Sequence, residues 1–286
     1  MEVRSLGLTS NPKKQEGPAL AQACISVCGD LGLRVVVDRS LSEHLSIQTG
    51  YEVSDRPADG VDALVVLGGD GTILRAVPEA SATGIPILGV NLGRIGFLAE
   101  VEPENLRDAL MRLRAGEYRV ERRMMLEVII EGHENICALN EVVLSRGTCA
   151  RMVGFDAYVG DTLVDHYIAD GLVVSAPTGS TAYSLSAGGP IVSPDVPCFI
   201  LSPICPHSLQ SRPIVLSDHE VVTLGINAEE PREGMAVCVD GQRTYAVHNH
   251  EHIRVRRAAA DACFIRFQEE RNFFTLLRSK LSQWSL

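Results

Sequence analysis

The chain of 286 residues is long enough for one large domain or two of ordinary size, and its composition, 45% hydrophobic and 22% charged, is that of a soluble globular protein. Its formal net charge of -10 argues against broad electrostatic attraction to nucleic acid or to anionic membranes, so we expect neither as a partner. Any phosphorylated substrate must then be held by local positive charge, backbone N–H groups or a metal ion.

The sequence shows neither a targeting signal nor a CxxC pair of cysteines. Residues 1–15 contain no apolar run of seven or more, and no segment approaches 18 apolar residues, so the predicted location is the cytoplasm. The eight cysteines are scattered without a CxxC pair, which favours buried reduced thiols over a structural zinc site.

The N-terminal part alternates between strands and helices in the β-α-β manner. Apolar runs predict strands at 3–9, 33–37, 62–67 and 85–90, and helical spacing predicts helices at 18–31, 72–80 and 103–115. This pattern predicts an open, Rossmann-like α/β domain over residues 1–117. Ligands of such sheets bind beyond the carboxyl ends of the strands.

From residue 119 to about 254, strands separated by Gly, Pro, Asp and Asn dominate. The predicted strands are 125–130, 138–145, 155–159, 172–175, 221–226 and 236–239. We therefore expect a second, mainly β sandwich domain over residues 118–259. The tail combines a strand at 263–267 with a helix-like end, so residues 260–286 are expected to return to the first domain.

The run Gly68-Gly69-Asp70-Gly71-Thr72 directly follows a buried strand. Glycines allow phosphate oxygens to approach main-chain N–H groups, and the following helix adds the positive end of its dipole. Asp70 can accept a hydroxyl proton or help hold a magnesium ion, while Thr72 can cap the helix or donate to phosphate. The alternative is a tight strand-to-helix turn in which the aspartate is only a cap. The run is neither a P-loop nor a GxGxxG motif.

The segment from Asp170 to Pro190 passes from a buried strand into a stretch dense in hydroxyls, glycines and small residues. Such a composition lets a ligand lie flat against the backbone with several O–H and N–H groups directed at it. Tyr183 adds a ring face on which a base can stack.

Taken together, these segments resemble the NAD kinase family. The matching blocks occur in the family's order and are Gly68 to Thr72, Asn91 to Leu98, Asn140-Glu141, Asp170 to Pro190 and Pro206 to Pro213. The first block is shared with lipid kinases, so the resemblance implies a first domain like that of diacylglycerol kinases; the later blocks favour NAD kinase.

The resemblance implies a role for each matching residue. Asp70 is the proton acceptor and an NAD contact, and Asn140 and Glu141 bind ribose hydroxyls. Phosphate and ATP are assigned to Gly68, Gly69, Gly71 and Thr72. Further NAD contacts are assigned to Gly71, Arg151, Asp170, Thr178, Thr181, Ala182, Tyr183, Ser184, Leu185, Ser186 and Gln242. The sequence departs from the family at Ile168, where a basic contact is missing, and at Ala176, which replaces a threonine.

Several side chains can be interpreted either as ligand contacts or as ordinary solvated residues. Arg75, one turn into the predicted helix, can reach phosphate and is assigned to NAD binding, but a solvated helix arginine explains it equally well. Lys13 and Lys14 carry the same ambiguity. The cluster from His248 to His252 lacks the helical spacing of zinc motifs, and no protein metal site is predicted there.

The implied reaction is the transfer of the ATP γ-phosphoryl group to the 2′-hydroxyl of the adenosine ribose of NAD. It uses Mg²⁺ or another divalent cation brought with ATP and no tightly bound cofactor, in a homodimer or homotetramer. A lipid or sugar kinase and a non-catalytic NAD(H) sensor are the competing hypotheses. The sequence leaves open whether NADH or polyphosphate is accepted and whether NADPH inhibits.

Overall fold

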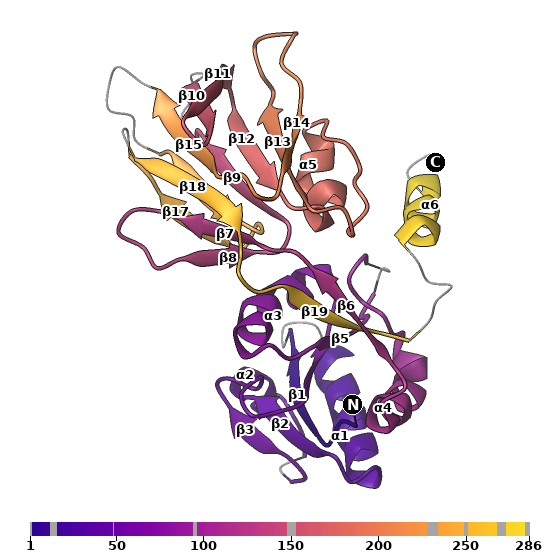
Figure 1. The fold of residues 1–286 in the computed structure, drawn as a ribbon. Helices are drawn as coiled ribbons and strands as arrows, with labels where there is room; N and C mark the ends of the chain where they lie inside the picture. The colour runs from indigo at the N-terminus through magenta and orange to yellow at the C-terminus, as the bar shows by residue number, and fades with distance from the viewer. Residues whose placement is uncertain are drawn as a thin grey trace. The chain divides into compact units, whose positions relative to one another are not determined.

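The computed structural model describes residues 2–11, 16–47, 49–93, 96–147, 153–227, 234–248, 251–267 and 273–283. The chain divides into two compact units, one formed by Met1–Arg122 with Ala262–Leu286 and the other by Arg123–Asp261 (Figure 1). Each unit has its own sheets and core.

The first unit contains a seven-stranded sheet. Its strands, in spatial order, are β3 (Glu52–Ser54), β2 (Arg34–Asp38), β1 (Ser5–Ser10), β4 (Ala63–Leu67), β5 (Ile87–Val90), β19 (Ala262–Arg266) and β6 (Arg119–Arg123). The strands from β3 to β19 pair in parallel. The helices are α1 (Glu16–Asp30), α2 (Arg39–Ser42), α3 (Asp70–Thr83), η1 (Pro103–Asn105), α4 (Leu106–Ala115) and α6 (Phe273–Gln283).

The apolar runs of this sheet are buried because helices lie on both of its faces. Alternate residues of β4 pack with the apolar sides of α1 and α4 in one core. On the opposite face α3 lies so close that a Cβ on Gly89 would stand 2.6 Å from Ile73. The predicted open α/β architecture is confirmed, and the tail does return, since β19 occupies an inner position of the sheet.

The second unit is a sandwich of two antiparallel sheets. One sheet orders its strands as β11 (Thr162–Ala169), β10 (Val153–Val159), β15 (Val222–Asn227), β18 (His252–Arg257), β7 (Leu126–Ile129) and β8 (Ile136–Ala138). The other orders them as β14 (Ile214–Ser217), β13 (Cys198–Ile204), β12 (Gly171–Ser175), β9 (Glu141–Ser145), β16 (Ala236–Val239) and β17 (Arg243–Ala246). A single hydrophobic core draws residues from both sheets, which confirms the predicted sandwich.

Two of the differences from the predicted element bounds bear on the candidate site. The predicted strand 138–145 is two strands, β8 and β9, because the chain turns at Leu139 and Asn140, whose N–H groups bond to the carboxylate of Asp240. The predicted helix 72–80 begins two residues earlier, at Asp70, and ends at Thr83.

Two further properties concern the described residues alone. None of their helices is long and apolar enough to cross a membrane. No cysteine within these ranges forms a disulfide bond, and Cys24, Cys28, Cys198 and Cys263 are buried.

Candidate functional site

The glycine turn joins the buried strand β4 to helix α3. A Cβ on Gly68 would stand 2.4 Å from the hydroxyl oxygen of Thr72, so glycine is required for this close approach. At Gly69 and Gly71 an added Cβ would meet no atom within 4 Å, so the turn is open at these positions. Gly69 occupies the N-cap position without a side-chain bond, and the expectation that Thr72 caps the helix is wrong because Thr72 lies inside the first turn.

Asp70 is the first residue of α3, and its carboxylate is fixed by the loop that follows β5. Its Oδ2 accepts a hydrogen bond from the N–H of Phe97 at 2.8 Å, and its Oδ1 accepts one from Leu98 at 3.1 Å. A Cβ on Gly96 would stand only 1.9 Å from Oδ1, so the loop can approach the carboxylate only with glycine at this position. The positive end of the α3 dipole favours the negative charge here.

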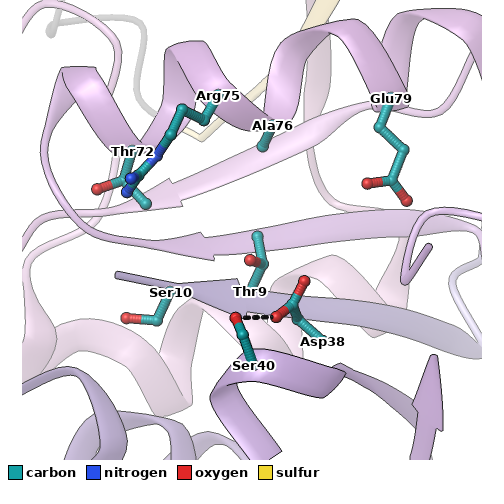
Figure 2. A pocket seen from close by; sticks show the side chains of 8 residues that line it. All are labelled: Thr9, Ser10, Asp38, Ser40, Thr72, Arg75, Ala76 and Glu79. Carbon is teal, nitrogen blue, oxygen red and sulfur yellow. Dashed lines mark hydrogen bonds between the residues drawn. The ribbon is translucent and has the colours of Figure 1, made fainter. Parts of the chain in front are cut away.

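Beside this turn lies a polar pocket of about 260 Å³. Its lining residues are Thr9, Ser10, Asp38, Ser40, Thr72, Arg75, Ala76 and Glu79. Figure 2 shows Thr72, Arg75 and Glu79 reaching into it from α3, opposite Asp38 at the end of β2 and Ser40 in α2. The strand order places this pocket outside the carboxyl ends of parallel strands at the point where the order reverses, between β1 and β4. Open α/β sheets bind ligands at this point.

Asn140 and Glu141 lie at the corner that precedes β9 in the second unit. The carbonyl oxygen of Asn140 accepts hydrogen bonds from the Ala176 N–H at 2.8 Å and the Ser175 hydroxyl at 3.1 Å. A Cβ on Gly179 would stand 2.2 Å from the same oxygen. The corner is therefore packed against the start of the segment that was predicted to bind the dinucleotide.

The Glu141 side chain is 6% exposed, and its Oε2 atom has no hydrogen-bond partner among the described residues. Burial and the negative charge of Asp240 raise the pKa of Glu141 to about 8, against the opposing effect of a hydrogen bond from the Tyr183 backbone N–H. A carboxyl group that carries its proton can both donate and accept, which suits a ribose hydroxyl.

The segment after β12 forms two short helical turns, η2 (Thr178–Thr181) and α5 (Tyr183–Ser186). The Tyr183 side chain is 44% exposed, so its ring is available for stacking. Ser184 is fully buried, and its hydroxyl lacks a partner within the described part of the chain. Thr181, Ala182 and Leu185 are partly buried and Ser186 is exposed, while Thr178 is buried.

The structure does not bring all the predicted contacts together. Asp170 precedes β12 at the end opposite Ser175, and its carboxylate pairs with Arg146 at 2.8 Å. Gln242 lies in the turn between β16 and β17, where its N–H bonds to Val239. Arg151, Lys13 and Lys14 lie outside the described residues, as do Asn249 and His250 of the histidine cluster. Within the described ranges, no group of three His, Cys, Asp or Glu side chains is arranged to hold a metal ion.

Sequence reasoning missed two residues that hold the site in place. Gly96 permits the loop to reach Asp70, and Asp240 bonds to the corner at Asn140. The Asp240-Gly241 pair carries a visible turn signal, but its link to a corner 100 residues away has no counterpart in the local pattern.

The chain matches two family models, the ATP-NAD kinase N-terminal domain over residues 6–118 and the ATP-NAD kinase C-terminal domain over residues 139–267. It is 40% identical to the NAD kinase of Caldanaerobacter subterraneus subsp. tengcongensis, covering 98% of this chain and 100% of that protein. It is 48% identical to the NAD kinase of Heliobacterium modesticaldum over 78% of this chain and 79% of the other.

Two solved structures share the fold. The yeast NADH kinase complexed with NADH is 25% identical, with a TM-score of 0.88 over 99% of this chain and 88% of that one. The NAD kinase from Archaeoglobus fulgidus in complex with ATP is 28% identical, with a TM-score of 0.75 over 96% of this chain and 97% of the other.

Proposed function

Because this chain belongs to the ATP-NAD kinase family, we propose that it transfers the γ-phosphoryl group of ATP to the 2′-hydroxyl of the adenosine ribose of NAD, giving NADP. The observation that carries the proposal is the fixed carboxylate of Asp70 beside an open glycine turn. Phosphoryl transfer needs an oriented acceptor for the hydroxyl proton next to groups that hold phosphates, and this turn combines the two.

Asp70 takes the proton of the attacking hydroxyl in this mechanism. Its two bonds to the N–H groups of Phe97 and Leu98 hold both carboxylate oxygens in place, so little reorganisation is needed when the hydroxyl arrives. The backbone at Gly69 and Gly71 and the N-terminus of α3 receive the transferred group and stabilise its charge.

The pocket beside α3 supports a site for the donor nucleotide. Arg75 supplies a positive charge for phosphate, and Asp38 stands at the end of β2, where Rossmann-type sheets place the acidic residue that binds a ribose diol. The cavity accommodates part of ATP rather than the whole molecule. This assignment gives Arg75 a role with ATP rather than with NAD.

NAD recognition is assigned to the second unit. Asn140 and Glu141 bind the ribose hydroxyls, because an amide beside a protonated carboxyl group can donate to and accept from a vicinal diol. Tyr183 stacks on a base, and the hydroxyls of Thr178, Thr181 and Ser184 complete the pocket. The contacts assigned to Asp170 and Gln242 rest on the family resemblance.

A divalent cation, Mg²⁺ or another, is expected to enter with ATP. The carboxylates at hand are Asp70 at the glycine turn and Asp38 and Glu79 in the pocket, a set that suits Mg²⁺ held mainly by substrate phosphates. When bound, the ion neutralises charge on the donor phosphates. A cytoplasmic location and a homodimer or homotetramer complete the proposal, and both rest on the family resemblance and the sequence.

Incubating the protein with ATP, Mg²⁺ and NAD, and measuring NADP enzymatically, tests the function. Asp70→Asn should lower kcat by about 10²-fold or more, because the variant loses the proton acceptor and its single oxygen can accept only one of the two N–H bonds from Phe97 and Leu98. NAD binding, which is assigned to the second unit, should survive. Asp108→Asn is the matched control, since Asp108 also lies in the first turn of a helix of the same unit. NAD binding without turnover by the wild type would select the sensor, and phosphorylation of a lipid or sugar instead of NAD would select the rival kinase.

A further inference from the structure

Asp240 carries one of the few buried carboxylates of the second unit, and it lies in a hairpin turn far from Asn140 in the sequence. The side chain is 9% exposed. Its Oδ2 accepts the N–H of Leu139 at 2.8 Å, and its Oδ1 accepts the N–H groups of Asn140 at 2.8 Å and Glu141 at 3.1 Å. In return the backbone N–H of Asp240 donates to the carbonyl of Glu141 at 3.0 Å.

These bonds hold the backbone where the chain leaves one sheet of the sandwich and enters the other. Strand β8 ends at Ala138 and β9 begins at Glu141, so the N–H groups of the corner need another acceptor. A single carboxylate supplies it for three consecutive residues. Charge-assisted hydrogen bonds of this kind are stronger than neutral ones and fix the direction in which the corner backbone runs.

We infer that Asp240 is a positioning residue for NAD: its carboxylate fixes the corner from Leu139 to Glu141 and thereby aims the side chains of Asn140 and Glu141 at the ribose diol. This inference rests on the proposed function for the identity of the ligand. It adds a residue to the site that touches neither the substrate nor the phosphates and acts through the two residues that bind the ribose.

The corner is held from both sides, which makes its direction well defined. On one side the Asn140 carbonyl is bonded by Ala176 and Ser175, and on the other side the three N–H groups are held by Asp240. Hydrogen bonds to both the carbonyl oxygen and the N–H groups are needed to fix the orientation of the peptide planes at this corner. Loss of the carboxylate removes the acceptor of these three N–H groups and leaves the corner held only through its carbonyl groups.

The hairpin turn itself allows a clean substitution. Asp240 and Gly241 have φ values of 50° and 64°, and the Gln242 N–H bonds to the Val239 carbonyl at 3.0 Å, so residues 239–242 form a tight turn within the three-residue connection between the paired Val239 and Arg243. Asparagine and glycine suit the first of these positions at least as well as aspartate. Asp240→Asn and Asp240→Gly therefore keep the turn and remove the charge or the whole side chain.

The test is the affinity for NAD, measured by calorimetry on the full chain, together with the KM values for NAD and ATP. Asp240→Asn is expected to weaken NAD binding about tenfold or more, because three bonds to a charged acceptor are lost or weakened, and to leave the KM for ATP unchanged. Asp240→Gly should show at least the same loss, and it replaces the asparagine variant if circular dichroism shows that variant to be unfolded.

Asp62→Asn is the matched control, because the Asp62 carboxylate also holds two consecutive backbone N–H groups, those of Arg4 and Ser5, both at 2.8 Å. It lies in the first unit and should lower the thermal midpoint without changing NAD affinity. A lower midpoint and unchanged NAD affinity in the Asp240 variants would overturn the inference.

A double-mutant cycle separates positioning from general loss of stability. If Asp240 acts through Asn140, the variant Asn140→Ala/Asp240→Asn should bind NAD little worse than the weaker single variant. Fully additive losses would contradict this. The binding measurement also separates the kinase function from the positioning role of Asp240. If the wild-type protein binds NAD but forms no NADP, the kinase function is refuted. The effect of Asp240→Asn on NAD affinity can still be measured in that case.

Discussion

Glu141 is a buried acid whose charge is opposed both by burial and by a neighbouring carboxylate. Its folded-state pKa is about 8, while the ordinary value is 4.5. Between these two values the folded protein holds a proton that the unfolded chain has released. The free energy of unfolding therefore falls as pH rises through this range, and the loss is complete only above the folded pKa.

We predict that Glu141→Gln flattens this pH dependence. The contribution of Glu141 to the slope is at most about 1.4 kcal/mol per pH unit between about pH 5 and pH 8, and the neutral amide removes it. Urea unfolding of both proteins across this range measures the difference. Glu104→Gln, at an exposed position, is the control and should keep the wild-type slope. Parallel profiles for wild type and Glu141→Gln would show that Glu141 is charged in the folded protein.

Helix α3 contributes residues both to the glycine turn and to the polar pocket. Asp70 is its first residue, and one face of the helix, with Thr72, Arg75 and Glu79, lines the polar pocket (Figure 2). The opposite side is apolar and covers the sheet, where Ile73 meets Gly89. The helix therefore fixes the distance between the proton acceptor and the proposed donor site.

Arg75→Ala is predicted to raise the KM for ATP about tenfold while the KM for NAD stays at the wild-type value, because a charge-assisted contact to phosphate is lost. Steady-state kinetics with each substrate varied in turn measures the two constants. The control is Arg107→Ala, an exposed helix arginine of the same unit that pairs with Asp30. A rise in the KM for NAD instead would return Arg75 to the role that the sequence suggested.

The elements that sequence reasoning found are those with a strong local pattern. Strand β4 was predictable because all of its residues are apolar and buried. The inner strands β13 and β18 were missed, although every residue of β13 is buried. Edge strands were missed too: β14 and β17 are half exposed with mixed composition, and β6 reads Arg-Val-Glu-Arg-Arg. Such strands exist because a neighbour offers hydrogen bonds, and that neighbour is distant in sequence.

The difference between local patterns and contacts between distant segments also explains which parts of the candidate site could be predicted from the sequence. The glycine turn and the hydroxyl-rich block each occupy one continuous run of sequence, so their composition alone was enough to predict a ligand site there. The roles of Gly96 and Asp240 depend on segments that meet only in the folded chain. Asp170 shows the converse, since its presence in the block did not place it near Asn140.

The first unit is closed by a buried ion-pair network around Arg266 of β19. This side chain contacts Glu121 of β6 and Glu100, and it donates to the Leu98 carbonyl at 2.9 Å. The N–H of Leu98 donates in turn to Asp70. The returning strand therefore supports the peptide that holds the proton acceptor.

Arg266→Met should lower the free energy of unfolding by about 3–5 kcal/mol, because the largely buried carboxylates of Glu100 and Glu121 lose the positive charge that compensates theirs. Arg34→Met breaks the exposed pair with Glu52, which water and salt screen, and should cost much less. Denaturant unfolding of the two variants gives the comparison. Equal losses would mean that the Arg266 network contributes no more than a surface pair.

The position of β19 also has a consequence for biosynthesis. The strand enters the sheet between β5 and β6, yet the ribosome makes it after the entire sandwich of residues 123–261. A nascent chain that has reached residue 261 thus presents two unpaired strand edges, on β5 and β6, to every neighbouring polypeptide. Protection of these edges must come from the speed with which the sandwich folds and delivers the last strand, or from a chaperone that occupies the gap during that interval.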